Sequence, residues 1–318
     1  MYTGMAHMDF RITIITGVSR SGKSLLGQLI GSMHNVEHVD EPWISMMLPV
    51  IQGKGLMDQE FSKMMLRSFT EELFMDVILL RRANFRPSDM SSIWDCKSAR
   101  EILFRLGKLH SRDDVRRYVH ENDSMLLYNL TGTVPYLSFF YKTFPNCKII
   151  HVVRNGLGVA LETVNKHWFS DTQLKNSLSN DLFREYQNIG SKYYLPWWLQ
   201  DEDTELFINM NEFARGLCFW RSLLELSQKQ IMELRESHSR TYHEVKYEKL
   251  IQNPTQVLKE ISAFLEISRS EKTESVISTI EDRTQFDLSD YPINHVPRIE
   301  MERVIKMLEM FNYSTEGL

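Results

Sequence analysis

The sequence is poor in cysteine. Its 318 residues contain only Cys96, Cys147 and Cys218, and no two of them form a CxxC pair. This spacing argues against a disulfide framework and against a thiolate zinc site. Unpaired cysteines are typical of a reducing compartment, so we expect a cytoplasmic protein.

Long apolar runs and low-complexity segments are also lacking. A membrane-spanning helix needs about 20 apolar residues, and no apolar run in the sequence comes near that length. The 14 glycines and 9 prolines are too few for a disordered linker, and no repeat of solenoid period is found. We therefore expect one domain over residues 1–318 with no membrane span, in which residues 1–8 are a candidate cloning remnant and about 156–210 form a cap region.

An excess of positive charge is the third absence. The chain has 37 Lys and Arg against 42 Asp and Glu, a formal net charge of −5 and an isoelectric point near 6.1. This balance gives no extended basic surface for nucleic acid or for an anionic membrane. Nucleic acid is thus not an expected partner, and any bound anion must be held by a local group of cations.

Apolar patterning predicts strands that alternate with helices along the whole chain. This order favours an α/β fold of the P-loop type, with three layers, a central parallel sheet flanked by helices, and a helical or irregular cap. Ligands of such sheets bind at the carboxyl ends of the strands. The expected strands are Arg11–Thr16, Val36–Val39, Ser92–Trp94, Lys148–Val153 and Tyr242–Tyr247, and the expected helices are 25–33, Phe61–Leu80, Leu126–Tyr141 (mostly helical), Glu212–Glu236 and Thr255–Leu265.

A phosphate-binding loop follows the first expected strand. The segment Gly17–Ser24, GVSRSGKS, matches G-x-x-x-x-G-K-[ST] and opens an expected helix, which is the context that this motif requires. Glycines let successive backbone N–H groups face a phosphate, and the helix N-terminus adds a partial positive charge. We expect the loop residues Ser19, Arg20, Ser21, Gly22, Lys23 and Ser24 to bind the ligand.

The loop alone leaves the ligand open. A P-loop kinase would need magnesium, held by Ser24 and by an acidic residue at a strand end. The strand KIIHVV ends in Arg154 and not in an aspartate, which favours a second anion-binding position. Asp40, Glu41 and Asp95 can still serve a metal, so an ATP-dependent small-molecule kinase remains the alternative, and a non-enzymatic nucleotide-binding regulator is a third interpretation.

Three separate segments, in the same order, resemble the sulfotransferases that use 3'-phosphoadenosine 5'-phosphosulfate (PAPS). Gly17–Leu25 is similar to the 5'-phosphosulfate loop of that family. Phe144–Leu161, FPNCKIIHVVRNGLGVAL, is similar to its 3'-phosphate segment, and Val245–Leu265 is similar to its Tyr-Glu-x-Leu…Pro…Phe-Leu stretch. The resemblance implies a sulfotransferase of the bacterial or carbohydrate-type branch, which transfers a sulfuryl group in line and without a metal.

The same resemblance implies which residues bind PAPS. Arg20 is expected to stabilise the leaving oxygen and Lys23 the 5'-phosphate or a sulfuryl oxygen, although the family more often has threonine at position 23. Arg154 is expected to bind the 3'-phosphate. Where the family usually places a serine for that phosphate this chain has Glu162, so Thr163 is the expected substitute, and an ion pair with Glu162 is the alternative interpretation of Arg154.

The resemblance also implies residues near the adenine and at the transfer site. Tyr247 corresponds to a tyrosine beside the adenine, and Phe286 lies where an adenine-stacking aromatic is often found; core packing is the simpler interpretation of both. Glu41, next to Pro42, resembles the catalytic glutamate and is expected to deprotonate the acceptor, while Lys97 is expected to stabilise the transferring group. We place Glu41 on a strand next to that of the phosphate loop. The alternative interpretation of Glu41 is a polar residue that caps a strand end, and that of Lys97 is an ordinary solvated lysine.

The acceptor is not identified by the sequence. A small-molecule, lipid or glycan acceptor with a hydroxyl or an amine is expected. Trp168, Trp197 and Trp198 can stack on an acceptor ring or sugar face, or can anchor their own loop.

Overall fold

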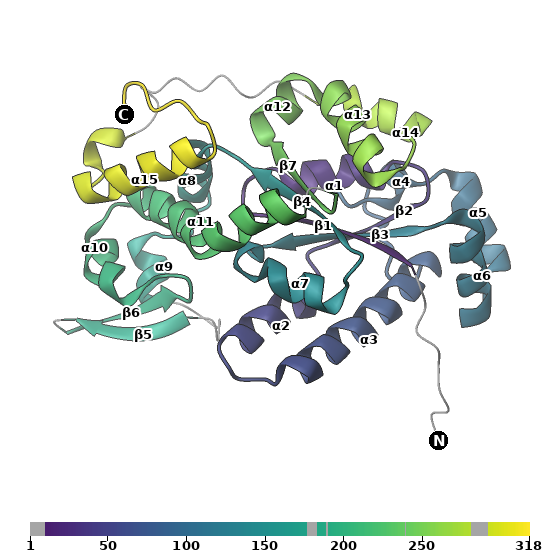
Figure 1. Ribbon diagram of the computed structural model, residues 1–318, viewed down its shortest axis with the longest axis horizontal. Coiled ribbons are helices and arrows are strands. Elements are labelled where there is room, and N and C mark those ends of the chain that lie inside the picture. Colours follow the sequence, from purple (N-terminus) through teal and green to yellow (C-terminus); the bar gives the residue numbers. More distant parts are fainter. Residues whose placement is uncertain (1–9, 177–182, 189, 239, 281–291) are drawn as a thin grey trace. The chain divides into compact units, whose positions relative to one another are not determined.

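The structure, a computed structural model, describes residues 10–176, 183–188, 190–238, 240–280 and 292–318 (Figure 1). These residues form two compact units. The sheet unit contains the described parts of 1–17, 22–152 and 230–282, and the hairpin unit contains those of 18–21, 153–229 and 283–318. The expected single domain stays a prediction.

A five-stranded sheet forms the centre of the sheet unit. Its strand order is β2-β3-β1-β4-β7, and the paired registers of the first four strands are parallel. The central strands are buried almost throughout because helices cover both faces. The strands are β1 (Arg11–Gly17), β2 (Val36–Asp40), β3 (Met125–Thr131), β4 (Lys148–Val153) and β7 (Tyr242–Lys246).

One face of this sheet packs on α1 (Lys23–Gly31), α12 (Tyr247–Gln252), α13 (Pro254–Leu265) and α14 (Glu271–Ile277), which share a continuous apolar core with it. The opposite face carries α2 (Trp43–Gly53), α3 (Gln59–Ile78) and α7 (Leu137–Thr143), as Figure 1 shows. The sheet unit therefore has the three layers expected from the sequence. Its remaining helices are α4 (Ile93–Cys96), α5 (Ala99–Lys108), α6 (Arg112–Asn122) and the short η1 (Val134–Tyr136).

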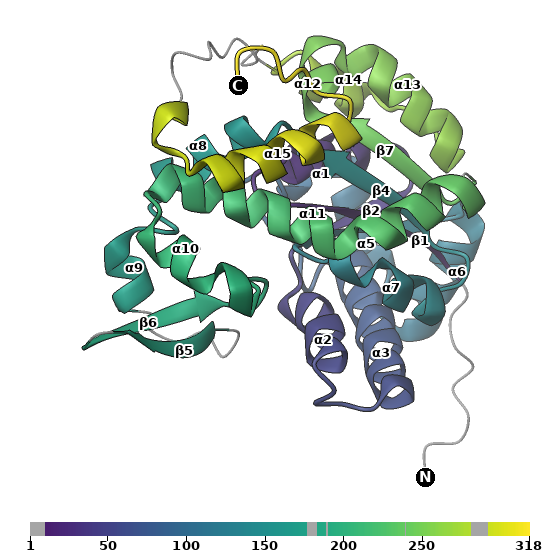
Figure 2. The same cartoon turned by 60° about the vertical axis from the view of Figure 1, so that its left-hand side comes forward.

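The hairpin unit combines helices with an antiparallel pair of strands, β5 and β6, which lies at the edge of the unit in Figures 1 and 2. Its elements are α8 (Gly156–Asn165), α9 (Asp171–Lys175), β5 (Phe183–Asn188), β6 (Ser191–Pro196), η2 (Asp201–Asp203), α10 (Thr204–Asn209), α11 (Glu212–Ser237, of which residues up to 229 belong here), η4 (Ile293–His295) and α15 (Arg298–Met310). Arg221 of α11 binds Glu300 of α15 at 2.7 Å and Asp203 at 3.1 Å, which ties these helices together through buried charges.

Most expected elements are confirmed, and two are wrong. The strand expected at Ser92–Trp94 is instead the start of α4, where the Ser92 hydroxyl accepts the Trp94 N–H. The expected helix at Leu126–Tyr141 begins as strand β3 and becomes helical only from η1 onward. The described part of 156–210, expected to be a helical or irregular cap, contains helices and non-regular segments and also a β-hairpin that was not expected. Among the described residues, no helix is long and apolar enough to cross a membrane.

Candidate functional site

The loop between β1 and α1 contains two residues with left-handed backbone. Arg20 has φ 68° and Gly22 has φ 92°, and Gly22 precedes the first residue of α1. No side chain caps the first turn of α1, and no acidic residue stands in that turn. The positive end of the helix dipole is thus neither capped nor neutralised locally, which suits an anionic ligand.

Gly22 is required for a second reason, its contact with Tyr247. A Cβ atom added to Gly22 would lie 2.3 Å from the Tyr247 ring, well inside van der Waals contact. Tyr247, the first residue of α12, therefore packs directly on the loop backbone. The structure places this tyrosine beside the loop, as its expected role next to a nucleotide requires.

Two polar side chains of the loop are buried. Ser21 is 1% exposed, and its hydroxyl has no hydrogen-bond partner among the described residues. Lys23 is 4% exposed. Burial raises the pKa of Asp40, whereas a hydrogen bond from Asn129 and the charge of Lys23 act to lower it. A buried hydroxyl without a partner is costly, so the chemistry of this loop fits a phosphate or sulfuryl oxygen as acceptor.

Arg20, Glu162 and Arg154 form a group of charges in the hairpin unit, which we call the loop cluster. Glu162 of α8 accepts from Arg20 at 2.5 Å, and its other oxygen lies 3.9 Å from the Arg154 guanidinium. Arg154 also donates to the Arg20 carbonyl at 2.8 Å. Two cations thus converge on one carboxylate, and the cluster keeps an excess positive charge.

Arg154 is held firmly in this position. It is only 7% exposed, its carbonyl accepts the Trp220 indole N–H at 3.1 Å, and Asn155 caps the helix that follows. Arg154 and Glu162 lie within ion-pair distance, as the alternative interpretation of Arg154 expects, but the Arg154 side chain is buried and does not form a surface pair. Trp220 was not found by sequence reasoning, since a tryptophan inside a long helical pattern gives no signal of its partner.

Glu162, and not Thr163, faces the two arginines. Thr163 is 1% exposed, and its hydroxyl donates to the Ala160 carbonyl at 2.7 Å within α8. A Cβ atom added to Gly216 of α11 would lie 2.4 Å from this hydroxyl, so the side chain points toward α11. The location of Thr163 does not support the expected phosphate contact, because successive helical residues point about 100° apart.

Glu41 lies at the carboxyl edge of the sheet in the sheet unit. It follows β2, and its N–H donates to the Asn129 backbone carbonyl at 3.0 Å. Its carboxylate accepts a hydrogen bond from the Thr131 hydroxyl at the end of β3. The register pairs Thr131 with Gly17, where the loop begins. The expectation that β2 adjoins β1 is wrong because β3 lies between them, which separates the two outer strands by about 10 Å. Thr131 was missed because β3 was assigned to a helix.

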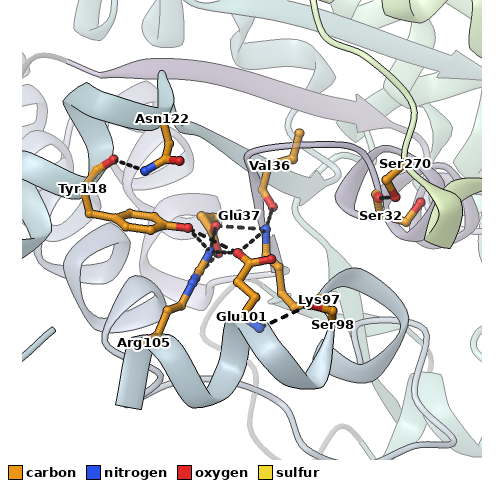
Figure 3. Close-up of polar contacts among 10 residues, drawn as sticks. All are labelled: Ser32, Val36, Glu37, Lys97, Ser98, Glu101, Arg105, Tyr118, Asn122 and Ser270. Atoms are coloured by element: carbon orange, nitrogen blue, oxygen red, sulfur yellow. Dashed lines mark hydrogen bonds and ion pairs between the residues drawn. The ribbon is translucent and has the colours of Figure 1, made fainter. Parts of the chain in front are cut away.

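Lys97 lies elsewhere, in a group that we call the buried cluster (Figure 3): Glu37, Lys97, Glu101 and Arg105. Its ammonium donates to the Val36 carbonyl at 2.7 Å and lies 3.0 Å from Glu37. Val36 is the first residue of β2, whereas Glu41 follows the last, so the two ends are about 15 Å apart. This location does not support the expected contact of Lys97 with the transferring group.

The remaining expected residues are Ser19, Ser24, Asp95 and Phe286. Ser19 and Ser24 lie on the loop and are partly exposed. Asp95, a candidate metal ligand of the kinase interpretation, accepts from Gln28 at 2.9 Å. Phe286 lies outside the described residues.

Comparison with known proteins gives a consistent result. The sequence matches the family described as "Sulfotransferase domain" over residues 11–314. The solved sulfotransferase domain of the Synechococcus PCC 7002 olefin synthase is similar, with a TM-score of 0.50 and 17% identity over 98% of this chain and 98% of that chain. This similarity confirms the predicted P-loop-type α/β fold.

Two further solved structures are similar at lower scores. A sulfotransferase from Mycobacterium avium has a TM-score of 0.49 and 10% identity, over 97% of this chain and 79% of that chain. A mouse sulfotransferase complexed with PAP has a TM-score of 0.41 and 11% identity, over 95% of this chain and 85% of that chain. No curated protein sequence matches the chain.

Proposed function

This chain belongs to the sulfotransferase family, and we propose that it transfers the sulfuryl group of PAPS to a hydroxyl or amine of a small-molecule, lipid or glycan acceptor. The family match favours sulfuryl transfer over the kinase that the loop motif alone left open. We also propose that the transfer is in line, needs no metal and takes place in the cytoplasm, for which the three free cysteines Cys96, Cys147 and Cys218 are the support.

The observation that carries the proposal is the chemistry of the phosphate loop. A buried serine hydroxyl without a partner, a helix N-terminus without a cap, and two arginines that share one carboxylate all suit an anionic ligand. PAPS carries phosphate groups at both its 3' and 5' positions. Ligand binding would supply the acceptor oxygens that Ser21 and the helix terminus lack.

Each residue then has a role in the proposal. Arg20 stabilises charge on the oxygen that leaves sulfur, and Lys23 binds the 5'-phosphate or a sulfuryl oxygen. Arg154 binds the 3'-phosphate bidentately. Ser19, Ser21, Gly22 and Ser24 bind through hydroxyls or backbone N–H groups, and Tyr247 lies against the nucleoside. Lys97 and Thr163 are left out because their side chains are committed to buried partners.

Glu41 is the proposed general base. An acceptor hydroxyl must lose its proton as it attacks sulfur, and an exposed carboxylate at the carboxyl edge of the sheet suits this task. Glu41→Gln should lower kcat about 100-fold while PAP binding is kept. Thr131→Val, which removes only the hydroxyl partner, is the matched variant and should keep most of the turnover. Retained turnover in Glu41→Gln would remove Glu41 from the mechanism.

The proposal is tested by ligand-dependent thermal stability and by transfer. PAP, the product nucleotide, should raise the melting temperature in the presence of EDTA, and ATP with magnesium should have a smaller effect. Labelled sulfate should move from PAPS to at least one member of a panel of phenols, sugars, amines and lipids. Stabilisation by ATP with magnesium but not by PAP would contradict the proposal.

A further inference from the structure

An aromatic pocket lies wholly within the hairpin unit. Its volume is about 370 Å³, within the range of small-molecule sites, and residues from α8, α9, β6 and α11 or the segments next to them surround it. Ser19 of the phosphate loop also lines it, directly before Arg20 in the chain. The pocket therefore adjoins the residue to which we assign the leaving oxygen.

The back of this pocket is a rigid aromatic wall. Phe169, Trp198 and Phe219 are each at most 8% exposed, and their ring centroids lie 5.3–5.8 Å apart. Phe207 packs edge-on against Trp198 at 5.7 Å and supports the wall from behind. Such ring contacts fix the wall before any ligand arrives, so little conformational entropy is lost on binding.

Trp168 stands at the rim of the same pocket. It is 41% exposed, and its ring meets Phe219 edge-on at 6.5 Å. His167 before it has φ 54°, a left-handed conformation that ends α8 and reverses the chain. Trp197 lines the pocket as well. Exposed indole surface is thus available to a flat ligand at the rim of the pocket.

The charged groups at the rim are basic. Lys166 and His167 line the pocket, and no Asp or Glu is found among its described lining residues. His167 lies 3.7 Å from Glu212, which offsets part of its charge when it is protonated, whereas Lys166 stays cationic. An acceptor with an ammonium group would meet like charge here, while a neutral or anionic acceptor would not.

The wall also disfavours a sugar. The polar lining side chains are Ser19, Gln173 and the two basic residues, of which the last three are exposed at the rim. Sugar hydroxyls placed against the buried rings would lose hydrogen bonds to water without replacement. A flat hydrocarbon ring loses none, and its burial contributes about 25 cal/mol per Å².

We propose that this pocket binds the acceptor, and that the acceptor is an aromatic hydroxyl compound that is neutral or anionic. The inference rests on the proposed function. In the transfer, the phenolic oxygen forms a bond to sulfur, the bond from sulfur to the 5'-phosphate oxygen breaks, and PAP departs with that electron pair. The phenolic proton is lost to a base, and the product is an aryl sulfate.

Three phenols of matched shape test the charge preference. They are 4-ethylphenol (neutral), 3-(4-hydroxyphenyl)propionate (anionic) and tyramine (cationic), titrated calorimetrically into protein saturated with PAP, with N-acetylglucosamine as the sugar. The first two should bind at least fivefold more tightly than tyramine and tenfold more tightly than the sugar. Tighter binding of tyramine or of the sugar would overturn the proposal.

A pair of tryptophan variants tests the location. Trp168→Ala should raise the Kd of 4-ethylphenol at least fivefold, with the melting temperature and the Kd of PAP unchanged. Trp94→Ala is the control, because Trp94 is 40% exposed but lies in the sheet unit, where its indole N–H donates to Phe85. Equal Kd values for 4-ethylphenol in the two variants would overturn the proposal.

The acceptor assignment and the sulfotransferase function can be tested separately. If PAP stabilises the protein and sulfate is transferred, but none of the phenols binds, the acceptor assignment is wrong and the sulfotransferase function stands. If PAP itself does not bind, the proposed function fails first.

Discussion

The loop cluster and the buried cluster differ in how completely their charges are matched. In the buried cluster, two carboxylates face two cations, and Glu37, Lys97 and Arg105 are at most 4% exposed, with Glu101 at 33%. In the loop cluster, one carboxylate faces two arginines, and Arg20 and Glu162 are 37% and 29% exposed. Matched charges that are mostly buried stabilise a fold, whereas an accessible cation excess can bind an anion from solution.

This comparison distinguishes two cations that were both expected to act in the transfer step. Arg20 was expected to stabilise the leaving oxygen, and Lys97 the transferring group. The geometry keeps Arg20 near a surface that a ligand can reach and commits Lys97 to Glu37. The predictions below test whether the two clusters are separate in function as well, from the largest expected effect to the smallest.

Breaking the buried cluster should have the largest effect. Arg105→Ala leaves Glu37 buried with fewer partners and should lower the free energy of unfolding by about 3–5 kcal/mol. Urea denaturation measures this. Arg116→Ala, which removes only an exposed pair with Asp113, is the control and should cost at most about 0.5 kcal/mol. A loss of similar size in both variants would mean that burial does not distinguish them.

Breaking the loop cluster should affect turnover and not folding. Arg20→Ala should lower kcat by about 10²–10³-fold, the effect of removing one donor from a developing oxyanion. Its melting temperature should stay within about 2 °C of the native value, because the side chain is partly exposed. Radiolabelled sulfate transfer and thermal unfolding are the measurements, again with Arg116→Ala as control. Retained turnover would exclude Arg20 from the mechanism.

Lowering the pH should weaken the stabilisation that the buried cluster gives to the fold. Burial alone would raise the pKa of Glu37, but the charges and hydrogen bonds of Arg105 and Lys97 outweigh it and lower this pKa to about 2. The stabilisation by Glu37 is thus complete above pH 4.5 and is lost as the pH falls from 4.5 toward 2. At pH 3 it should be smaller by about 2 kcal/mol. Glu37→Gln should lack this step in urea unfolding between pH 5.5 and 3, and the same pH dependence in both proteins would contradict the assignment.

The smallest effect is expected for the shared carboxylate. If Glu162 competes with a phosphate for Arg20 and Arg154, Glu162→Gln should tighten PAP binding about twofold to fivefold, since a partly exposed ion pair contributes at most about 1 kcal/mol. Glu202→Gln, an exposed residue of the same unit, is the control in isothermal titration. An unchanged Kd would show that Glu162 does not compete with the ligand.

Sequence patterns predicted the elements whose apolar residues have clear limits. The strand–loop–helix at 11–33, the strand Lys148–Val153 and the helix over 212–236 are confirmed. Strand β3 was missed because it lies between β2 and β1 and is buried on both faces. Its run MLLYNLT therefore has no alternation, and a continuous apolar run does not distinguish a strand from a helix.

The site was predicted where it depends on neighbours in the chain, and less well where it depends on distant ones. The loop motif predicted the glycine with left-handed backbone and the start of α1. It could not show that Tyr247 packs on Gly22 or that Lys97 is sealed against Glu37. Those contacts join residues 225 and 60 positions apart, and they follow from tertiary packing, which local spacing does not encode.

The contact of Tyr247 with Gly22 has a consequence for how this protein can change. Any side chain at position 22 would have to displace the tyrosine ring, and the φ of 92° adds a separate backbone cost. A mutation that reshapes this turn therefore also displaces the tyrosine ring that we propose to contact the nucleoside. Under the proposed function the turn and the tyrosine cannot vary separately, so variation among the descendants of this chain should be found mainly in other parts of the protein.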